Sequence, residues 1–152
     1  MTELEDRVRR LEDILEIHQL FVDYGLALDA GDFDAYAALF ADDGEVLLGP
    51  MGRAKGREEI KALMTGTLGG RAGTSFHIIS SPQVQLDGDT ATSEVMWSVV
   101  TRDESGRAGL TMIGRHRDDL VRERGRWKIA RRRGFVDIPS TMPAGSASSA
   151  PT

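Results

Sequence analysis

The spacing of apolar residues changes near residue 70, from a helical period to an alternating one, and this change restricts the chain to folds in which helices precede strands. In the first part, apolar residues recur at steps of four and three, at Leu4, Val8, Leu11 and Leu15. That spacing predicts one long helix over 4–29. Two further helices and one short strand are predicted over 33–40, 57–64 and 45–48.

The second part of the chain has the composition of long strands. Short glycine-containing turns separate four segments with strand-like alternation, 74–86, 90–102, 108–122 and 126–137. Turns of this kind join antiparallel neighbours, so we expect a meander with the helices on one face of the sheet. The predicted architecture is an α+β fold, in which a curved sheet forms a half-open cone around a helical lid.

Length and charge restrict the class of protein further. A chain of 152 residues corresponds to one domain, predicted over 1–140, and an Ala-, Ser- and Pro-rich flexible tail is predicted over 141–152. A formal charge of −5 argues against a general nucleic-acid binder. No apolar stretch approaches the roughly 20 residues of a membrane span, and the acidic N-terminus is unlike a signal peptide. We therefore expect a cytoplasmic protein with no nucleic-acid or membrane partner.

The candidate chemistry depends on the three histidines, because the chain contains no cysteine. Thiolate metal sites, disulfides and cysteine nucleophiles are thereby excluded, and the histidine spacing predicts no metal site. His77 lies in the predicted strand 74–86, where a core role and a catalytic role are both open. His116, among arginines and aspartates, is expected to face solvent or a partner. His18 is expected to pack along the long helix.

Asp29 is expected in the last turn of the long helix, where the helix dipole disfavours a negative charge. It therefore needs a cationic or N–H-donating partner, and a histidine would serve. The alternative is an exposed carboxylate hydrogen-bonded to the turn at Gly31, and the residues alone leave both open. The run Arg131–Arg133 alternates faces on a strand, and we expect it to form a solvated edge.

The order and spacing of several short segments resemble the SnoaL-like branch of the NTF2-like superfamily over about residues 5–137. These segments are Tyr24–Asp34, Leu39–Gly44, Gly56–Ile60, His77, Asp87–Ala91, Gly114–Asp118 and Gly125–Ile129. Within that branch the chain is similar to scytalone dehydratase, bile-acid 7α-dehydratase and the lindane dehydrochlorinase. The resemblance implies a cone-shaped mixed sheet wrapped around the long helix, with an interior pocket.

The resemblance also implies a site. Asp29 and His77 match the family's aspartate–histidine dyad, and Tyr24 matches a tyrosine five residues before the aspartate in the bile-acid enzyme. The implied activity is that of a cofactor-independent lyase or isomerase on a hydrophobic, cyclic small molecule, with His77 as general base. The expected substrate-binding residues are Phe21, Met96, Trp97, Ile113 and Arg132.

The sequence differs from these enzymes at two places, and two other classes of function are also open. The stretch 97–101 lacks the second histidine of scytalone dehydratase, and Asp137 stands where the bile-acid enzyme has an arginine. The same pocket would also suit a non-catalytic carrier of small molecules, or a subunit of a larger enzyme. The apolar stripe of the long helix favours a homo-oligomer, and the resemblance implies a trimer more than a dimer.

Overall fold

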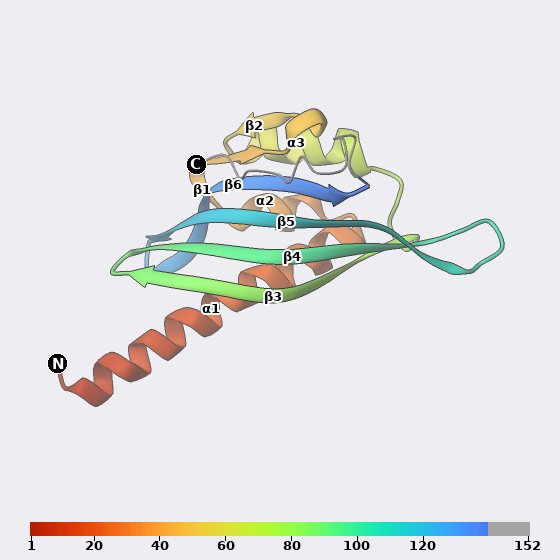
Figure 1. The fold of residues 1–152 in the computed structure, drawn as a ribbon. Coiled ribbons are helices and arrows are strands. Elements are labelled where there is room, and N and C mark those ends of the chain that lie inside the picture. The colour runs from red at the N-terminus through yellow and green to blue at the C-terminus, as the bar shows by residue number, and fades with distance from the viewer. Residues whose placement is uncertain (140–152) are drawn as a thin grey trace.

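A computed structural model describes residues 1–139, and the predicted tail over 141–152 lies outside them (Figure 1). Three α-helices and one 3-10 helix are present: α1 (Glu3–Ala30), α2 (Phe33–Ala38), η1 (Gly49–Met51) and α3 (Arg57–Leu68). The six strands are β1 (Phe40–Leu47), β2 (Arg53–Lys55), β3 (Ser75–Asp87), β4 (Thr90–Arg102), β5 (Ala108–Glu123) and β6 (Arg126–Ile138).

The strands form one curved sheet in the order β2-β1-β6-β5-β4-β3. The predicted meander β3-β4-β5-β6 is antiparallel throughout, whereas β1 pairs with β6 in parallel, so the sheet is mixed. The sheet curves over α1, and α2 and α3 cover its other end (Figure 1). The predicted α+β cone is therefore confirmed. No helix within residues 1–139 has the length and apolar character needed to cross a membrane.

The first strand differs most from its predicted bounds. The strand predicted over 45–48 begins earlier in the structure, because β1 starts at Phe40 and shifts register between Phe40 and Glu45. Gly44 permits this irregularity, because a Cβ there would lie 2.9 Å from the Phe40 Cβ. Arg57 supports it by donating two hydrogen bonds to the Phe40 carbonyl, at 2.7 and 3.0 Å. The three-residue strand β2 was not predicted, because three residues are too few to show an alternation.

Polar contacts fix α1 at both ends and against the sheet. Thr2 and Glu5 form a capping box at its start, and Gly31 ends it in the left-handed conformation at φ 71°. In the middle, Asp13 accepts hydrogen bonds from Trp127 Nε1 at 3.0 Å and from Arg122 Nη2 at 2.7 Å. These contacts join the middle of α1 to β5 and β6, and the C-terminal half of the helix then packs against β3.

Candidate functional site

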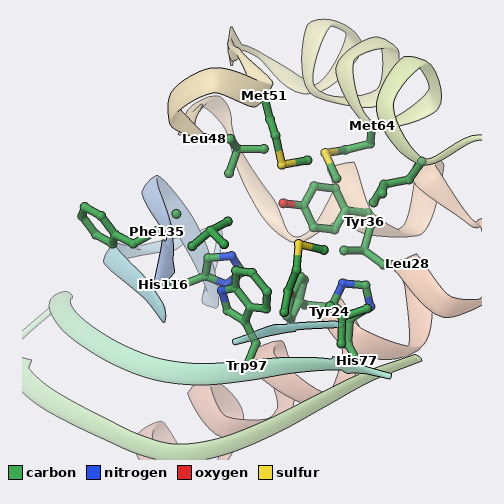
Figure 2. A pocket seen from close by; sticks show the side chains of 15 residues that line it. Tyr24, Leu28, Tyr36, Leu48, Met51, Met64, His77, Trp97, His116 and Phe135 are labelled. Atoms are coloured by element: carbon green, nitrogen blue, oxygen red, sulfur yellow. The ribbon is translucent and has the colours of Figure 1, made fainter. Parts of the chain in front are cut away.

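A pocket of about 80 Å³ lies between the inner face of the sheet and the layer of α2, η1 and α3. Figure 2 shows Met51 and Met64 entering it from η1 and α3, opposite Trp97 and His77 on the strands. Apolar and aromatic side chains predominate, which suits a mostly apolar ligand. The lining residues are Tyr24, Leu28, Tyr36, Leu48, Met51, Met64, Leu68, His77, Trp97, Val99, Met112, His116, Gly134, Phe135 and Val136.

Asp29 and His77 meet at the wall of this pocket. Asp29 Oδ1 lies 2.7 Å from His77 Nδ1 and also accepts the backbone N–H of His77 at 2.9 Å. Because a carboxylate only accepts hydrogen bonds, the neutral imidazole carries its proton on Nδ1, and this tautomer leaves the lone pair on Nε2. Their side chains are 12% and 17% exposed, for His77 and Asp29 respectively. Two environments were predicted for Asp29, a histidine partner or the turn at Gly31, and the structure places Asp29 against the histidine.

Tyr24 reaches the same place from one turn earlier in α1. Five residues on a helix are separated by about 140°, so Tyr24 and Asp29 point in different directions from α1. His77 lies between them, with Asp29 at its Nδ1 and the Tyr24 ring edge-on at a centroid distance of 5.7 Å. Burial raises the pKa of the Tyr24 hydroxyl, and the opposing effect of Arg132 is smaller. The hydroxyl therefore stays protonated and can act as a donor.

Arg132 does not line the pocket, contrary to its predicted role in substrate binding. It is fully buried and forms a two-pronged pair with Asp118, Nε to Oδ1 at 2.9 Å and Nη2 to Oδ2 at 2.8 Å. Its guanidinium carbon lies 4.6 Å from the centre of the Tyr24 ring, so the pair supports Tyr24 from behind. Burial acts to lower the pKa of Arg132, but Asp118 and the nearby tyrosines outweigh it and raise this pKa. The expectation of a solvated arginine run is wrong at this position.

His116 is buried and faces the pocket, whereas the sequence predicted a solvent- or partner-facing residue. Its ring lies 5.0 Å from that of Tyr24 and 5.8 Å from that of Trp97. Within residues 1–139 its buried Nδ1 has no hydrogen-bond partner. Burial, followed by the Arg132 charge and by His77, holds the pKa of His116 well below its ordinary value.

The lowered pKa of His116 predicts a loss of stability in mild acid. The unfolded chain binds this proton below about pH 6.5 while the folded chain does not, so stability is fully present above that pH. As the pH falls below it, the free energy of unfolding decreases by up to about 1.4 kcal/mol per pH unit. We expect urea unfolding at pH 7 and pH 5 to show a smaller pH dependence for His116→Gln than for the unchanged protein. An equal pH dependence in both proteins would contradict a neutral buried His116.

Three other predicted substrate-binding residues lie away from the pocket, and only Trp97 lines it. Phe21 is part of the core beneath the sheet. Met96 is 39% exposed on the outer face of β4, because neighbouring residues of a strand point to opposite faces and Trp97 occupies the inner one. Ile113 lies on the outer side of β5, next to the inward-facing Gly114.

Sequence reasoning missed several lining residues, and one signal could have found His116. Even-numbered residues of β5 from Gly114 to Leu120 face inward. Counting back from the apolar Leu120 in steps of two therefore predicts that Asp118 and His116 lie on the buried face. No comparable signal exists for Tyr36, Met51 or Met64, which reach the pocket only through the packing of α2, η1 and α3. In the described part of the chain, no group of three or more histidine and acidic side chains is placed to hold a metal ion.

A curved mixed sheet over a long helix, with a pocket at its inner face, defines the NTF2-like class of proteins. A family model for the SnoaL-like domain matches residues 9–133. The chain belongs to the SnoaL-like family.

Known relatives agree with this membership. An uncharacterized protein of Mycobacterium tuberculosis is 33% identical over 127 residues, which cover 82% of this chain and 86% of the relative. The crystal structure of an NTF2-like protein with a cystatin-like fold from Novosphingobium aromaticivorans matches with a TM-score of 0.82 and 32% identity, over 93% of this chain and 92% of that one. A candidate scytalone dehydratase from the same organism matches with a TM-score of 0.72 and 26% identity, over 84% of this chain and 85% of that one.

Proposed function

We propose that this protein is a lyase or isomerase of the dehydratase type, which removes a proton from carbon in a hydrophobic, cyclic small molecule. The observation that carries the proposal is the contact of 2.7 Å between Asp29 and His77 at the pocket wall. This contact orients the imidazole and stabilises the imidazolium that forms when Nε2 takes a proton. A solved relative named as a candidate scytalone dehydratase adds support from similarity.

The remaining residues supply what elimination needs besides a base. His77 Nε2 accepts the proton, the electron pair of the C–H bond forms a double bond, and the leaving group departs with its own electrons. Tyr24, kept protonated by burial, donates its O–H to the oxygen on which negative charge develops. The apolar lining excludes water, and the flexible side chains of Met51, Met64 and Met112 can shift to admit a larger ring.

Asp29→Asn tests the proposal without a known substrate. A suitable probe is 5-nitrobenzisoxazole: a base takes the C–H proton of its isoxazole ring, the C–H electron pair forms the nitrile, and the N–O bond breaks to release a coloured phenolate. We expect the unchanged protein to accelerate this ring opening. The asparagine amide keeps the contact to the His77 backbone but removes the charge that stabilises the imidazolium. The rate should therefore fall by about 100-fold or more.

The carrier function gives a different outcome in the same experiment. A carrier would bind the probe or a similar apolar ring saturably, without accelerating ring opening, and Asp29→Asn would change only its affinity. Equal rates for Asp29→Asn and the unchanged protein would contradict the catalytic proposal and favour the carrier.

A further inference from the structure

The long helix α1 has two apolar faces, and only one of them is covered within residues 1–139. Ile17, Leu20, Tyr24 and Leu28 pack against the sheet. A second row, which we call the outer stripe, consists of Leu4, Val8, Leu11, Leu15 and Val22, each between 46% and 67% exposed. At about 100° per residue the outer stripe lies roughly opposite the packed face. The first turns of α1 also extend beyond the strands (Figure 1).

The spacing of the outer stripe is that of a coiled-coil seam. Its first four members are separated by four, three and four residues, and His18 and Val22 continue the alternation. In heptad terms Val8, Leu15 and Val22 occupy the a positions, and Leu4, Leu11 and His18 occupy the d positions. Valine at two of the three a positions, with leucine at two of the three d positions, favours two parallel strands over three.

The charges beside the outer stripe specify both the partner and its direction. Arg7 occupies a g position and Glu12 the next e position, and in a parallel pair these two face each other across the seam. Two such opposite-charge pairs would form in a symmetric dimer. In an antiparallel pair the e positions face each other instead, which would bring Glu5 close to Glu12 of the other copy. The chain is therefore complementary to a second copy of itself in the parallel direction.

We propose that two copies of this chain associate through the outer stripes of their α1 helices, as a short parallel coiled coil. The capping box of Thr2 and Glu5 orders the first turn, so the helices need not fold on association. Over residues 4–22 the packed face of α1 is turned away from the seam. The seam ends there, because Gly25 and Asp29, which would be its next d and a positions, lie against β3. Neither the Asp29–His77 pair nor the pocket takes part.

Single cysteines introduced into this cysteine-free chain test the seam and its direction. Leu11→Cys places one thiol at a d position, where it meets its own copy only in a parallel, in-register pair. Asp6→Cys is the matched control, because it lies on the opposite face of the same exposed segment. Under mild oxidation at micromolar concentration, Leu11→Cys should give mostly disulfide-linked dimer on a non-reducing gel. Equal, low yields from both variants would overturn the proposal.

A charge exchange tests the complementarity separately. By sedimentation equilibrium, Arg7→Glu should raise the dimer dissociation constant about tenfold, and the combination of Arg7→Glu with Glu12→Arg should restore it. Leu11→Asp, which places a charge in the seam, should raise it more than 100-fold. A wild-type monomer at tens of micromolar, or an assembly that Leu11→Asp leaves intact, would overturn the proposal. Failure of the double variant to recover would exclude the parallel register.

Discussion

His77→Ala is expected to lower the rate of 5-nitrobenzisoxazole ring opening by at least about 100-fold, while the fold persists. The substitution removes the imidazole nitrogen that Asp29 orients toward the pocket. It retains the Cβ beside Gly25 and the backbone N–H that Asp29 accepts at 2.9 Å, so the junction of α1 and β3 keeps its contacts. The measurement is the initial rate by absorbance, together with the thermal midpoint of both proteins.

Two controls separate loss of the base from loss of structure. His77→Gln preserves the size of the side chain and a hydrogen bond to Asp29 but cannot accept a proton, so it should be as inactive as His77→Ala. Added imidazole should enter the space left in His77→Ala and recover part of the rate. A rate in His77→Ala equal to that of the unchanged protein would refute the assignment of His77 as the base.

Asp118→Ala should destabilise the protein by about 3–5 kcal/mol, the largest effect on stability that we expect. Asp118 and Arg132 are fully buried, and removal of the carboxylate leaves the Arg132 cation without its partner beneath Tyr24. The free energy of unfolding from urea titration measures the effect. The pocket should be affected as well, because Tyr24 rests on the guanidinium.

The neighbouring residue provides a matched control for this prediction. Asp119 pairs with Arg133 on the outer face at 3.4 Å and is about half exposed, so Asp119→Ala should cost no more than about 1 kcal/mol. If Asp118→Ala does not fold, the combination of Asp118→Leu with Arg132→Met should recover the fold, because neither charge then remains buried. A cost for Asp118→Ala as small as that for Asp119→Ala would show that the buried pair contributes little.

Local features of the sequence were sufficient to predict the elements and their order. The long helix, the four long strands and the turns between them follow from apolar periods and from turn residues that are close in the chain. Gly31 ends α1 and Asp32 begins α2, and such caps can be read from the sequence because capping depends on only a few neighbouring residues. Asp29 and His77 were each candidates from the residues alone, but their pairing was predicted only through the family resemblance, since 48 residues separate them.

The faces of the strands were predicted less well, because side-chain direction has a period of two and one residue of register reverses it. Met96 was placed inside and His116 outside by their character rather than by their parity, and both are reversed in the structure. The register of β5 against β6 shifts between Asp119 and Leu120, where β6 carries one extra residue. The buried positions of β6 therefore pass from Trp127 and Ile129 to Arg132, and its alternation could not be carried across this point.

The sequence by itself thus determined the α+β order of elements, the long helix with its apolar stripes, and the residue types available for acid–base chemistry. Only the tertiary structure decided that Asp29 contacts His77, that Arg132 is neutralised by Asp118 behind Tyr24, and that His116 faces the pocket. Each of these contacts joins residues on different elements, and their proximity depends on how the sheet curves over α1. Periodicity records which side of an element is buried, but it does not record which residues of two elements meet.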